Sequence, residues 1–248
     1  MDLHTFFSQH PAVAVAVSGG TDSAYLLYAA SQAARVRAYC VHTPFQTPSE
    51  LEDARRLCVQ LGVELTVLDV DILENAAVQA NPANRCYYCK RALFAAIGAA
   101  AQADGFDCVI EGTNASDDVS DRPGWQALQE LGVRSPLRMA GLTKAEIRAR
   151  SQAAGLFTHD KPANACLATR IPTGQPITRE LLAKTAAAEA FLRTLGFCGL
   201  RVRHFHGCAR IQIPEAQMPL LLEHRVEILQ HFQDDYAGVL LDLEVRHV

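Results

Sequence analysis

The sequence lacks several features that would assign it to common classes. No apolar run reaches the length of about 18 residues that a membrane-spanning helix needs. The start, Met1-Asp2-Leu3-His4, lacks the basic and apolar regions of a secretory signal. The net charge is −4, so no excess of lysine and arginine provides a broad nucleic-acid surface. We therefore expect a cytoplasmic protein with neither a membrane nor a nucleic acid as partner.

A further absence concerns phosphate binding: no Gly-Lys-Ser/Thr sequence of a Walker loop follows the first predicted strand. Instead, residues 18–23 read Ser-Gly-Gly-Thr-Asp-Ser between an apolar run and a helical pattern. A strand that turns through two glycines into a helix presents backbone N–H groups at the positive end of the helix dipole. Ser18 and Ser23 add hydroxyl donors, and Asp22 is suited to hold Mg²⁺ against bound phosphates. The segment predicts a site for the pyrophosphate of a nucleotide.

Short apolar segments alternate with helical patterns in the first part of the chain. Strands are predicted at 12–17, 35–42, 64–70 and 107–111, and helices at 24–34, 49–61 (with Ser49 as its cap) and 90–103. This alternation is typical of a parallel sheet covered by helices on both faces, a doubly wound α/β fold. Ligands of such sheets lie at the carboxyl ends of the strands, where residues 18–23 stand.

A stretch with three prolines at 162–176 leads into a second part of the chain. Its predicted elements are a helix at 179–195, strands at 200–205 and 209–213, a helix at 217–232 and a strand at 237–243. This order predicts a smaller α+β domain. We expect the division to fall between residues 1–165 and residues 166–248.

A second candidate ligand segment, Glu111-Gly112-Thr113-Asn114, ends the fourth predicted strand at the same edge of the sheet. Gly112 lets the backbone approach a ligand closely, while Thr113 and Asn114 offer hydroxyl and amide groups. An ordinary exit from strand to loop fits the segment equally well. The acidic residues that follow could hold magnesium or simply be solvated; they are Asp117, Asp118 and Asp121.

Three of the eight cysteines stand in places that suggest chemistry. Cys86 and Cys89 would share one side of a helix that they open, and Cys166 lies in a loop before Arg170. A lone Cys-x-x-Cys pair is also compatible with half a zinc site or with chance spacing. Three thiolates are one short of a closed zinc site, yet they suffice for an iron–sulfur cluster with one open iron. Alternatively, Cys86 and Cys89 are structural and Cys166 acts alone.

Two arginines in the second part are candidates for anion binding. Arg201 and Arg203 lie two apart on a predicted strand, so both point to one face while Val202 points to the other. Paired guanidinium groups suit a bidentate grip on a phosphate, although a solvated strand face is the simpler alternative. On the preceding helix, Glu189 is by itself an exposed helical acid.

These segments together resemble one family. Residues 18–23 resemble the PP-loop of the ATP pyrophosphatases, which have an adenine nucleotide α-hydrolase-like fold. From residue 10 to residue 215 the chain resembles the LarE sulfur transferases of that superfamily. The motifs that carry the resemblance are 18–23, 85–90, 112–114, 122–124, 134–137, 160–172 and 201–204. The resemblance implies that ATP adenylates a carboxylate of pyridinium-3,5-biscarboxylate mononucleotide, and that sulfur then displaces AMP to give a thiocarboxylate for the nickel-pincer cofactor of lactate racemase.

The resemblance also implies roles for single residues. ATP would be bound by Ser18, Gly19, Gly20, Asp22, Ser23, Gly112, Thr113 and Asn114, with Mg²⁺ on Asp22. In one branch of the family three cysteines, here Cys86, Cys89 and Cys166, hold a [4Fe-4S] cluster, and in another Cys166 alone is the sacrificed sulfur donor. We place this chain in the cluster branch, with Arg170 and Glu189 near the reaction centre and Arg201 and Arg203 on the substrate phosphate. The expected partners are the small-molecule nucleotide and further copies of the chain; the sulfide source stays open.

Two other activities compete with this interpretation. PP-loop proteins also thiolate tRNA, which predicts a basic groove that the net charge of −4 does not favour. An ammonia-dependent amide ligase of the NAD-synthetase kind would also form an acyl adenylate. It would need no cysteines, so replacement of Cys86, Cys89 or Cys166 distinguishes it from a sulfur transferase.

Overall fold

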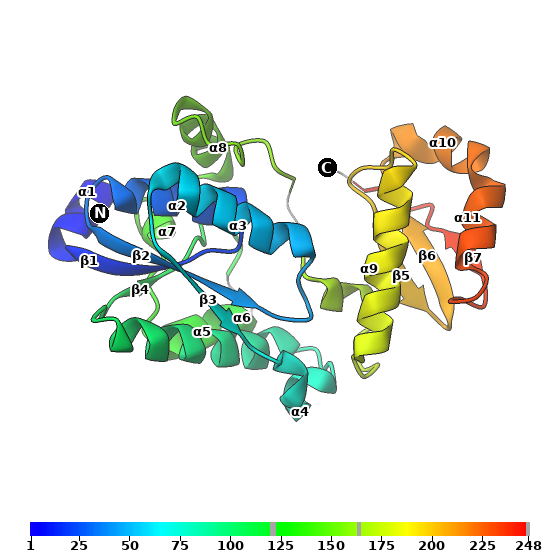
Figure 1. The fold of residues 1–248 in the computed structure, drawn as a ribbon, viewed down its shortest axis with the longest axis horizontal. Coiled ribbons are helices and arrows are strands. Elements are labelled where there is room, and N and C mark those ends of the chain that lie inside the picture. Colours follow the sequence, from blue (N-terminus) through cyan, green and yellow to red (C-terminus); the bar gives the residue numbers. More distant parts are fainter. Residues whose placement is uncertain (120–122, 163–164, 247–248) are drawn as a thin grey trace. The chain divides into compact units, whose positions relative to one another are not determined.

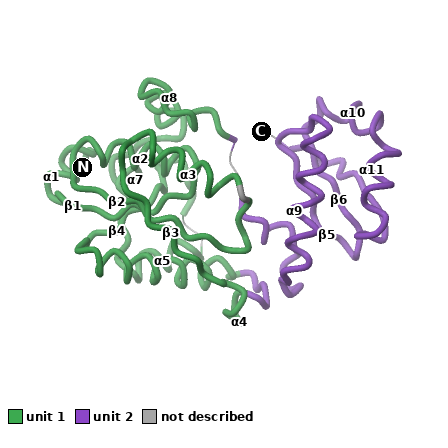
Figure 2. Tube along the Cα trace, in the orientation of Figure 1, with its two compact units in different colours: residues 1–78, 84–161 green, residues 79–83, 162–248 purple. Residues whose placement is uncertain are grey.

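The structure, a computed structural model, divides into two compact units. It describes residues 1–119, 123–162 and 165–246. Unit 1 comprises residues 1–78 and 84–161, and unit 2 comprises residues 79–83 and 162–248 (Figure 2). Each unit has its own hydrophobic core. No pattern in the sequence predicts that the short segment 79–83 leaves the first unit.

Four parallel strands form the sheet of unit 1, in the order β3-β2-β1-β4. They are β1 (Ala12–Ala16), β2 (Arg35–His42), β3 (Leu65–Asp69) and β4 (Val109–Ile110). Along β1, Val13 and Val15 belong to one buried cluster and Ala14 to another, so the sheet is buried on both faces. The predicted parallel sheet is confirmed.

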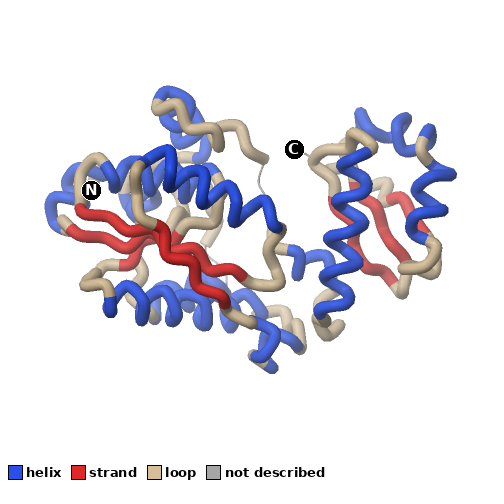
Figure 3. Tube along the Cα trace, viewed as in Figure 1, coloured by secondary structure: helices blue, strands red, loops and turns tan. Residues whose placement is uncertain are grey.

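Helices cover both faces of this sheet. The helices α2 (Thr21–Ser31) and α3 (Pro48–Leu61) lie on one face and α5 (Arg85–Ala103) lies on the other (Figure 1). The remaining helices of the unit are α1 (Leu3–Gln9), α4 (Ala76–Gln79), α6 (Pro123–Glu130), α7 (Pro136–Met139) and α8 (Lys144–Ala153), with a 3₁₀ turn η1 (Ile72–Glu74). The layers of helix and strand, visible in Figure 3, confirm the doubly wound α/β fold. None of the helices in the described part of the chain is both long and apolar enough to span a bilayer.

Helix starts differ most from the sequence-based expectation. The cap of α3 is Thr47, not Ser49, because Glu50 reaches back to accept from the Thr47 backbone N–H at 3.0 Å in a capping box. The helix α5 begins at Arg85 rather than Lys90, so both thiols of the Cys-x-x-Cys pair lie inside it.

Unit 2 is a small α+β unit with a mixed sheet in the order β5-β6-β7. The strands β5 (Arg201–Phe205) and β6 (Cys208–Gln212) are antiparallel, and β7 (Val239–Leu241) runs parallel to β6. Its helices are α9 (Arg179–Thr194), α10 (Met218–Glu223) and α11 (Arg225–Phe232), with 3₁₀ turns η2 (Leu167–Arg170) and η3 (Glu215–Gln217). The prediction of a single helix at 217–232 is therefore wrong: two helices lie there, and His224 separates them.

The segment 79–83 is fixed to unit 2 through Asn81. This residue is 1% exposed and has a φ of 54°. Its side-chain amide donates to the carbonyl oxygens of Pro172 at 2.8 Å and Gln175 at 3.1 Å, and its own carbonyl accepts from Gly174 N–H at 2.8 Å. Buried backbone carbonyls need hydrogen-bond donors. The Asn81 side chain supplies them to the loop at residues 172–175, which lies about 90 residues further along the chain.

Candidate active site

The predicted phosphate loop turns between β1 and α2, with Gly20 as the N-cap residue of the helix. Gly19 has a φ of 72°, and a Cβ atom there would lie 2.5 Å from the carbonyl oxygen of Glu50, so only glycine fits. Ser23 Oγ accepts from the backbone N–H of Ser18 at 3.2 Å and closes the loop. No side chain of the described residues caps α2, so the N–H groups of its first turn remain for a ligand.

The end of β4 lies directly against this loop. A Cβ atom on Gly112 would lie 2.9 Å from the backbone nitrogen of Ser23, so the close approach requires glycine here too. The buried carboxylate of Glu111 accepts from Thr113 Oγ1 at 2.8 Å, from Thr113 N–H at 3.0 Å and from the hydroxyl of Ser135. This network orients the strand exit, a role for Glu111 and Ser135 that the sequence did not reveal.

Asn114 shapes the next turn. Its Oδ1 accepts from Ser116 N–H at 2.8 Å, and its own N–H donates to Asp117 Oδ2 at 3.0 Å. Arg138 Nη1 then donates to the carbonyl oxygen of Asp117 at 2.9 Å. The third of the acidic candidates, Asp121, lies outside the described residues.

A cavity of about 350 Å³ lies between the two segments. Its polar wall contains six of the predicted nucleotide-binding residues: Ser18, Gly20, Asp22, Ser23, Gly112 and Thr113. Its apolar wall contains Val17, Val41, Leu93, Phe94 and Ile97. Ligand pockets typically combine such an apolar wall with a few polar groups, and this volume lies within their range of about 300–1,000 Å³.

Two lysines that no local sequence pattern marks as ligands reach the phosphate loop. Lys144, the first residue of α8, pairs with Asp22 through Nζ and Oδ2 at 2.6 Å. Lys161 Nζ donates to the carbonyl oxygen of Gly19 at 2.8 Å and also pairs with Asp53. Lys161 belongs to a motif of the family resemblance, whereas the sequence around Lys144 signals only a helix cap.

The carboxylate of Asp22 retains one unused oxygen. Its Oδ1 is buried and has no hydrogen-bond partner among the described residues, while Oδ2 binds Lys144. Magnesium at phosphate sites is commonly held by one or two carboxylates together with the phosphates, so this oxygen suits such a cation. No group of three or more His, Cys, Asp or Glu side chains in the described ranges is arranged to hold a metal ion by itself.

The Cys-x-x-Cys pair lies in the first turns of α5. Cys86 is exposed and Cys89 is half-buried. Arg85, which is 9% exposed, places Nη2 3.9 Å from the sulfur of Cys86. The three-residue spacing puts both thiols on one side of the helix, as predicted.

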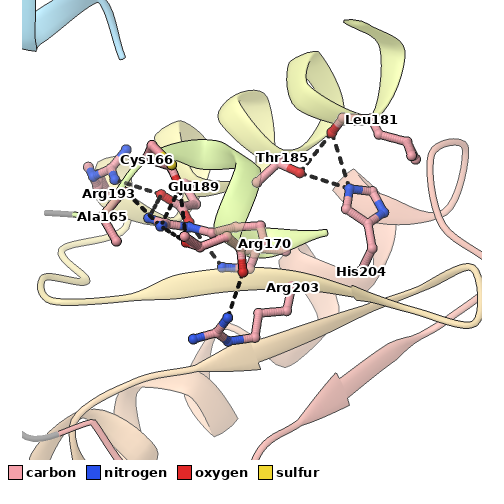
Figure 4. A network of polar contacts seen from close by, with 11 residues as sticks. Ala165, Cys166, Arg170, Leu181, Thr185, Glu189, Arg193, Arg203 and His204 are labelled. Atoms are coloured by element: carbon pink, nitrogen blue, oxygen red, sulfur yellow. Dashed lines mark hydrogen bonds and ion pairs between the residues drawn. The ribbon is translucent and has the colours of Figure 1, made fainter. Parts of the chain in front are cut away.

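In unit 2, Arg170 holds the backbone around Cys166 (Figure 4). Cys166 is the N-cap residue of η2, and Arg170 at the end of that turn is 2% exposed. Arg170 Nη1 donates to the carbonyl oxygen of Ala165 at 2.8 Å and contacts that of Cys166 at 3.4 Å. The guanidinium therefore supports the turn that presents the thiol.

The expectation that Glu189 is an exposed acid is wrong, because its carboxylate is the buried partner of Arg170. Arg170 Nε donates to Glu189 Oε1 at 2.8 Å, and the glutamate is fully buried. Val202 N–H donates to Oε1 at 3.2 Å and Arg193 Nη2 donates to Oε2 at 3.0 Å. The pair thus joins η2, α9 and β5.

Arg201 and Arg203 extend from one face of β5, and Val202 between them is fully buried, as predicted. Arg203 Nη1 donates to the carbonyl oxygen of Thr169 at 2.8 Å. Burial, together with the charges of Arg246 and Arg170, lowers the pKa of Arg201 to about 10. Burial and the charge of Arg170 likewise lower the pKa of Arg203.

The predicted residues thus gather in two sets, one in each unit. Six of the eight nucleotide-binding candidates line the cavity of unit 1, all but Gly19 and Asn114, and Cys86 and Cys89 lie on the helix that supplies part of its apolar wall. Cys166, Arg170, Glu189 and Arg203 form one polar network in unit 2 (Figure 4). Each set is suited to one half of a reaction: nucleotide binding in the first, anion and thiol chemistry in the second.

Comparison with known proteins gives similarity along nearly the whole chain. Residues 12–86 match the family of the queuosine biosynthesis protein QueC. An uncharacterized protein of Synechocystis is 37% identical over 248 residues, which covers 98% of this chain and 92% of the relative. The pyridinium-3,5-bisthiocarboxylic acid mononucleotide synthase of Lactiplantibacillus plantarum is 32% identical over 235 residues, which covers 93% of this chain and 85% of the relative. An uncharacterized protein of Methanocaldococcus jannaschii is 29% identical over 235 residues, which covers 94% of this chain and 90% of the relative.

Proposed function

The chain belongs to the family of the pyridinium-3,5-bisthiocarboxylic acid mononucleotide synthase, the LarE sulfur transferases with a PP-loop, and from this membership we propose its substrate and the roles of its residues. It is an ATP-dependent sulfur transferase. The proposed substrate is pyridinium-3,5-biscarboxylic acid mononucleotide, of which a carboxylate becomes a thiocarboxylate. The product would serve the synthesis of a nickel-pincer nucleotide.

The cavity of unit 1 would bind ATP. The apolar wall around Leu93 and Phe94 suits the adenine base, while the phosphate loop and the start of α2 suit the triphosphate. Asp22 would hold Mg²⁺ through its unused Oδ1. A substrate carboxylate oxygen then attacks the α-phosphorus, the bond to the β-phosphate oxygen breaks, and pyrophosphate leaves.

Lys144 would neutralise charge on the pyrophosphate that leaves. Its ammonium group pairs with Asp22 Oδ2, so it would lie beside a cation held on the unused Oδ1 and could contact the phosphate oxygens that the cation binds. Cations that face developing negative charge stabilise the transition state. Lys161, tied to Gly19 and Asp53, would keep the loop backbone in position.

Cys86, Cys89 and Cys166 would hold a [4Fe-4S] cluster. Their donor chemistry fits, because thiolates are the usual ligands of such clusters and all three cysteines are present. A cluster with three protein ligands would supply an open iron that carries the sulfide for transfer. Arg170 would fix the turn that presents Cys166. Sacrifice of the Cys166 sulfur is the alternative route to the same product.

Arg201 and Arg203 would bind the phosphate of the mononucleotide. Their guanidinium groups are half-buried on one face of β5; burial and the charge of Arg170 lower the pKa of both, and the charge of Arg203 also lowers the pKa of Arg201. An anion between them would relieve that repulsion and use their planar donors. A homo-oligomer and a cytoplasmic location stay predictions from the sequence.

The proposal rests on one observation: a chain of this family combines a PP-loop cavity with a turn in which Arg170 supports the backbone of Cys166. Its test is an anaerobic assay with ATP, sulfide and the biscarboxylate mononucleotide. We expect pyrophosphate release that depends on the mononucleotide, and a product in which sulfur has replaced oxygen. Amide formation from ammonia that survives replacement of all three cysteines would contradict the proposal, as would a dependence on tRNA.

The sulfur route has its own test. Anaerobically purified protein would contain iron and acid-labile sulfide, both lost in Cys86→Ser, Cys89→Ser and Cys166→Ser variants. Replacement of Cys58, a buried thiol whose pKa burial raises to about 11, is the matched control and leaves the iron content unchanged. Bound zinc, or conversion of Cys166 to dehydroalanine after turnover, would exclude the cluster route.

A further inference from the structure

The C-terminal segment after β7 is hydrogen-bonded alongside the end of β6. Asp242 N–H donates to the carbonyl oxygen of Ile211 at 2.8 Å, and Gln212 Nε2 donates to the carbonyl oxygen of Glu244 at 3.1 Å. The backbone N–H of Arg246 then donates to the carbonyl oxygen of Ile213 at 3.1 Å. These bonds fix the position of Arg246 relative to the small sheet.

The guanidinium of Arg246 has no protein partner among the described residues. Its Nε is buried and makes no hydrogen bond, and no ion pair joins it to an acid of those residues. Burial and then the charge of Arg170 lower its pKa, and Arg246 in turn lowers the pKa of Arg201. Arg246 therefore stands in the same cationic group as Arg201 and Arg203, the two candidates for the phosphate.

The acids near this group are already engaged. Glu189 accepts hydrogen bonds from Arg170, Arg193 and the Val202 backbone. Asp242 lies 3.4 Å from Arg210 Nε, on the neighbouring strand. The remaining guanidinium groups are an excess of half-buried positive charge, and such charge is costly unless an anion pairs with it.

We propose that Arg246 is a third phosphate-binding residue, which joins Arg201 and Arg203 around the phosphomonoester of the mononucleotide substrate. The identity of the substrate rests on the proposed function, whereas the binding of a phosphate by these arginines does not. A phosphate dianion offers three terminal oxygens, which can be shared among several guanidinium groups. The buried, unbonded Nε is the donor that a phosphate oxygen would satisfy.

Calorimetric titration of the full chain with inorganic phosphate and with ribose 5-phosphate tests this role. We expect Arg246→Ala to weaken binding of both probes by roughly 10- to 100-fold, the range for one lost charge-assisted hydrogen bond. Arg246→Lys would restore part of the affinity, because it keeps the charge without the planar donors. Arg225→Ala, which removes an exposed arginine of α11, is the control and leaves the affinity unchanged.

A second readout separates phosphate binding from a merely structural role. Without phosphate, Arg246→Ala should melt no lower than wild type, since it removes a repelling charge, while the rise in melting temperature on addition of phosphate becomes smaller. A lower melting temperature without phosphate, affinity equal to wild type, or no binding of either probe by wild type would each overturn the inference. Arg246-dependent binding without turnover of the pyridinium mononucleotide would instead refute the proposed function and leave the inference standing.

Discussion

At the scale of single residues, the second unit depends on one buried ion pair. Arg170 and Glu189 are 2% and 0% exposed; the arginine donates to the carbonyls before η2, and the glutamate accepts from the N–H group of Val202 on β5. A buried charge without its partner is strongly destabilising, whereas a well-packed apolar pair can replace both charges at little cost. The pair therefore offers a way to separate folding from the positioning of Cys166.

We expect Glu189→Leu alone to lower the free energy of unfolding by about 3–5 kcal/mol, because Arg170 is left buried and unpaired. The double variant Arg170→Met, Glu189→Leu should recover part of that stability in urea denaturation, because no charge is left buried, although the Ala165 carbonyl and the Val202 N–H group lose their partners. Sulfur transfer should nevertheless stay low in the double variant, since the carbonyls of Ala165 and Cys166 have lost their donor. Full activity in the stable double variant would show that the pair does not position Cys166.

The buried side chain of His204 should make the stability of the protein depend on pH. Burial lowers the pKa of His204 below 6.5; the charge of Lys184 acts in the same direction, and the hydrogen bond to the Leu181 carbonyl opposes it. His204 therefore binds a proton more readily in the unfolded chain than in the folded protein. Its contribution to stability is complete above pH 6.5 and is lost as the pH falls from there through the pKa of the folded state. In thermal melts over this range, His204→Gln should lose less stability on acidification than wild type. Equal losses in both proteins would contradict this account.

At the scale of elements, the nucleotide cavity is made where one strand end meets one helix start. Local signals predicted much of this arrangement: β2 has the bounds that its apolar run indicates, and the glycine turn leads from β1 into α2 as expected. Contacts between distant segments were not predictable. Lys144 meets Asp22 across 122 residues, and Glu189 is buried by an arginine 19 residues away, so neither pattern appears in a local window.

Gly112→Ala tests the approach of β4 to α2. The added Cβ would meet backbone atoms of Ser23 at 2.9 Å and Asp22 at 3.1 Å, and backbone cannot yield as a side-chain end can. We expect destabilisation of about 1–3 kcal/mol and loss of ATP binding, measured by titration with a nonhydrolysable analogue. Gly98→Ala is the control: nothing lies within 4 Å of its Cβ, so this helical site should gain about 0.5–1 kcal/mol and keep ATP affinity.

Lys144→Gln tests the link between α8 and the phosphate loop. Both side chains of the Lys144–Asp22 pair are about a quarter to a third exposed, so we expect a stability loss of less than about 1 kcal/mol. The rate of adenylation, measured as pyrophosphate release, should fall by a much larger factor of about 10–100, because no cation then neutralises the charge on the leaving pyrophosphate. Lys184→Gln removes a comparable ion pair with Glu180 on α9 and should leave pyrophosphate release unchanged. Equal effects of the two substitutions would refute a role for Lys144 in catalysis.

At the scale of the whole molecule, the chain passes between the two units three times, at residues 78 and 79, 83 and 84, and 161 and 162. Sequence patterns predicted two parts with the correct classes of secondary structure. They missed the excursion at 79–83 because its defining contacts, from Asn81 to residues 172–175, join segments that are distant along the chain. The excursion ends directly before the helix that carries Cys86 and Cys89.

Asn81→Ala should therefore destabilise unit 2 rather than unit 1. The substitution leaves buried carbonyls without donors and places alanine at a φ of 54°, for a combined cost of about 2–4 kcal/mol. Hydrogen exchange would report it as faster exchange of the Gly174 and Ile177 amides, while amides of β1 and β2 keep their protection. Equal acceleration in both units would mean that the segment stabilises the fold as a whole.

The excursion also sets an order of events on the ribosome. Asn81 emerges 91 residues before Pro172, the loop residue that it must bind. Domains tend to fold in the order of their synthesis, so the parallel sheet would close while this short segment is still unanchored. Residues 79–83 of unit 2 are thus synthesised before unit 1 is complete. Unit 2 can finish folding only when its later residues bind this earlier segment.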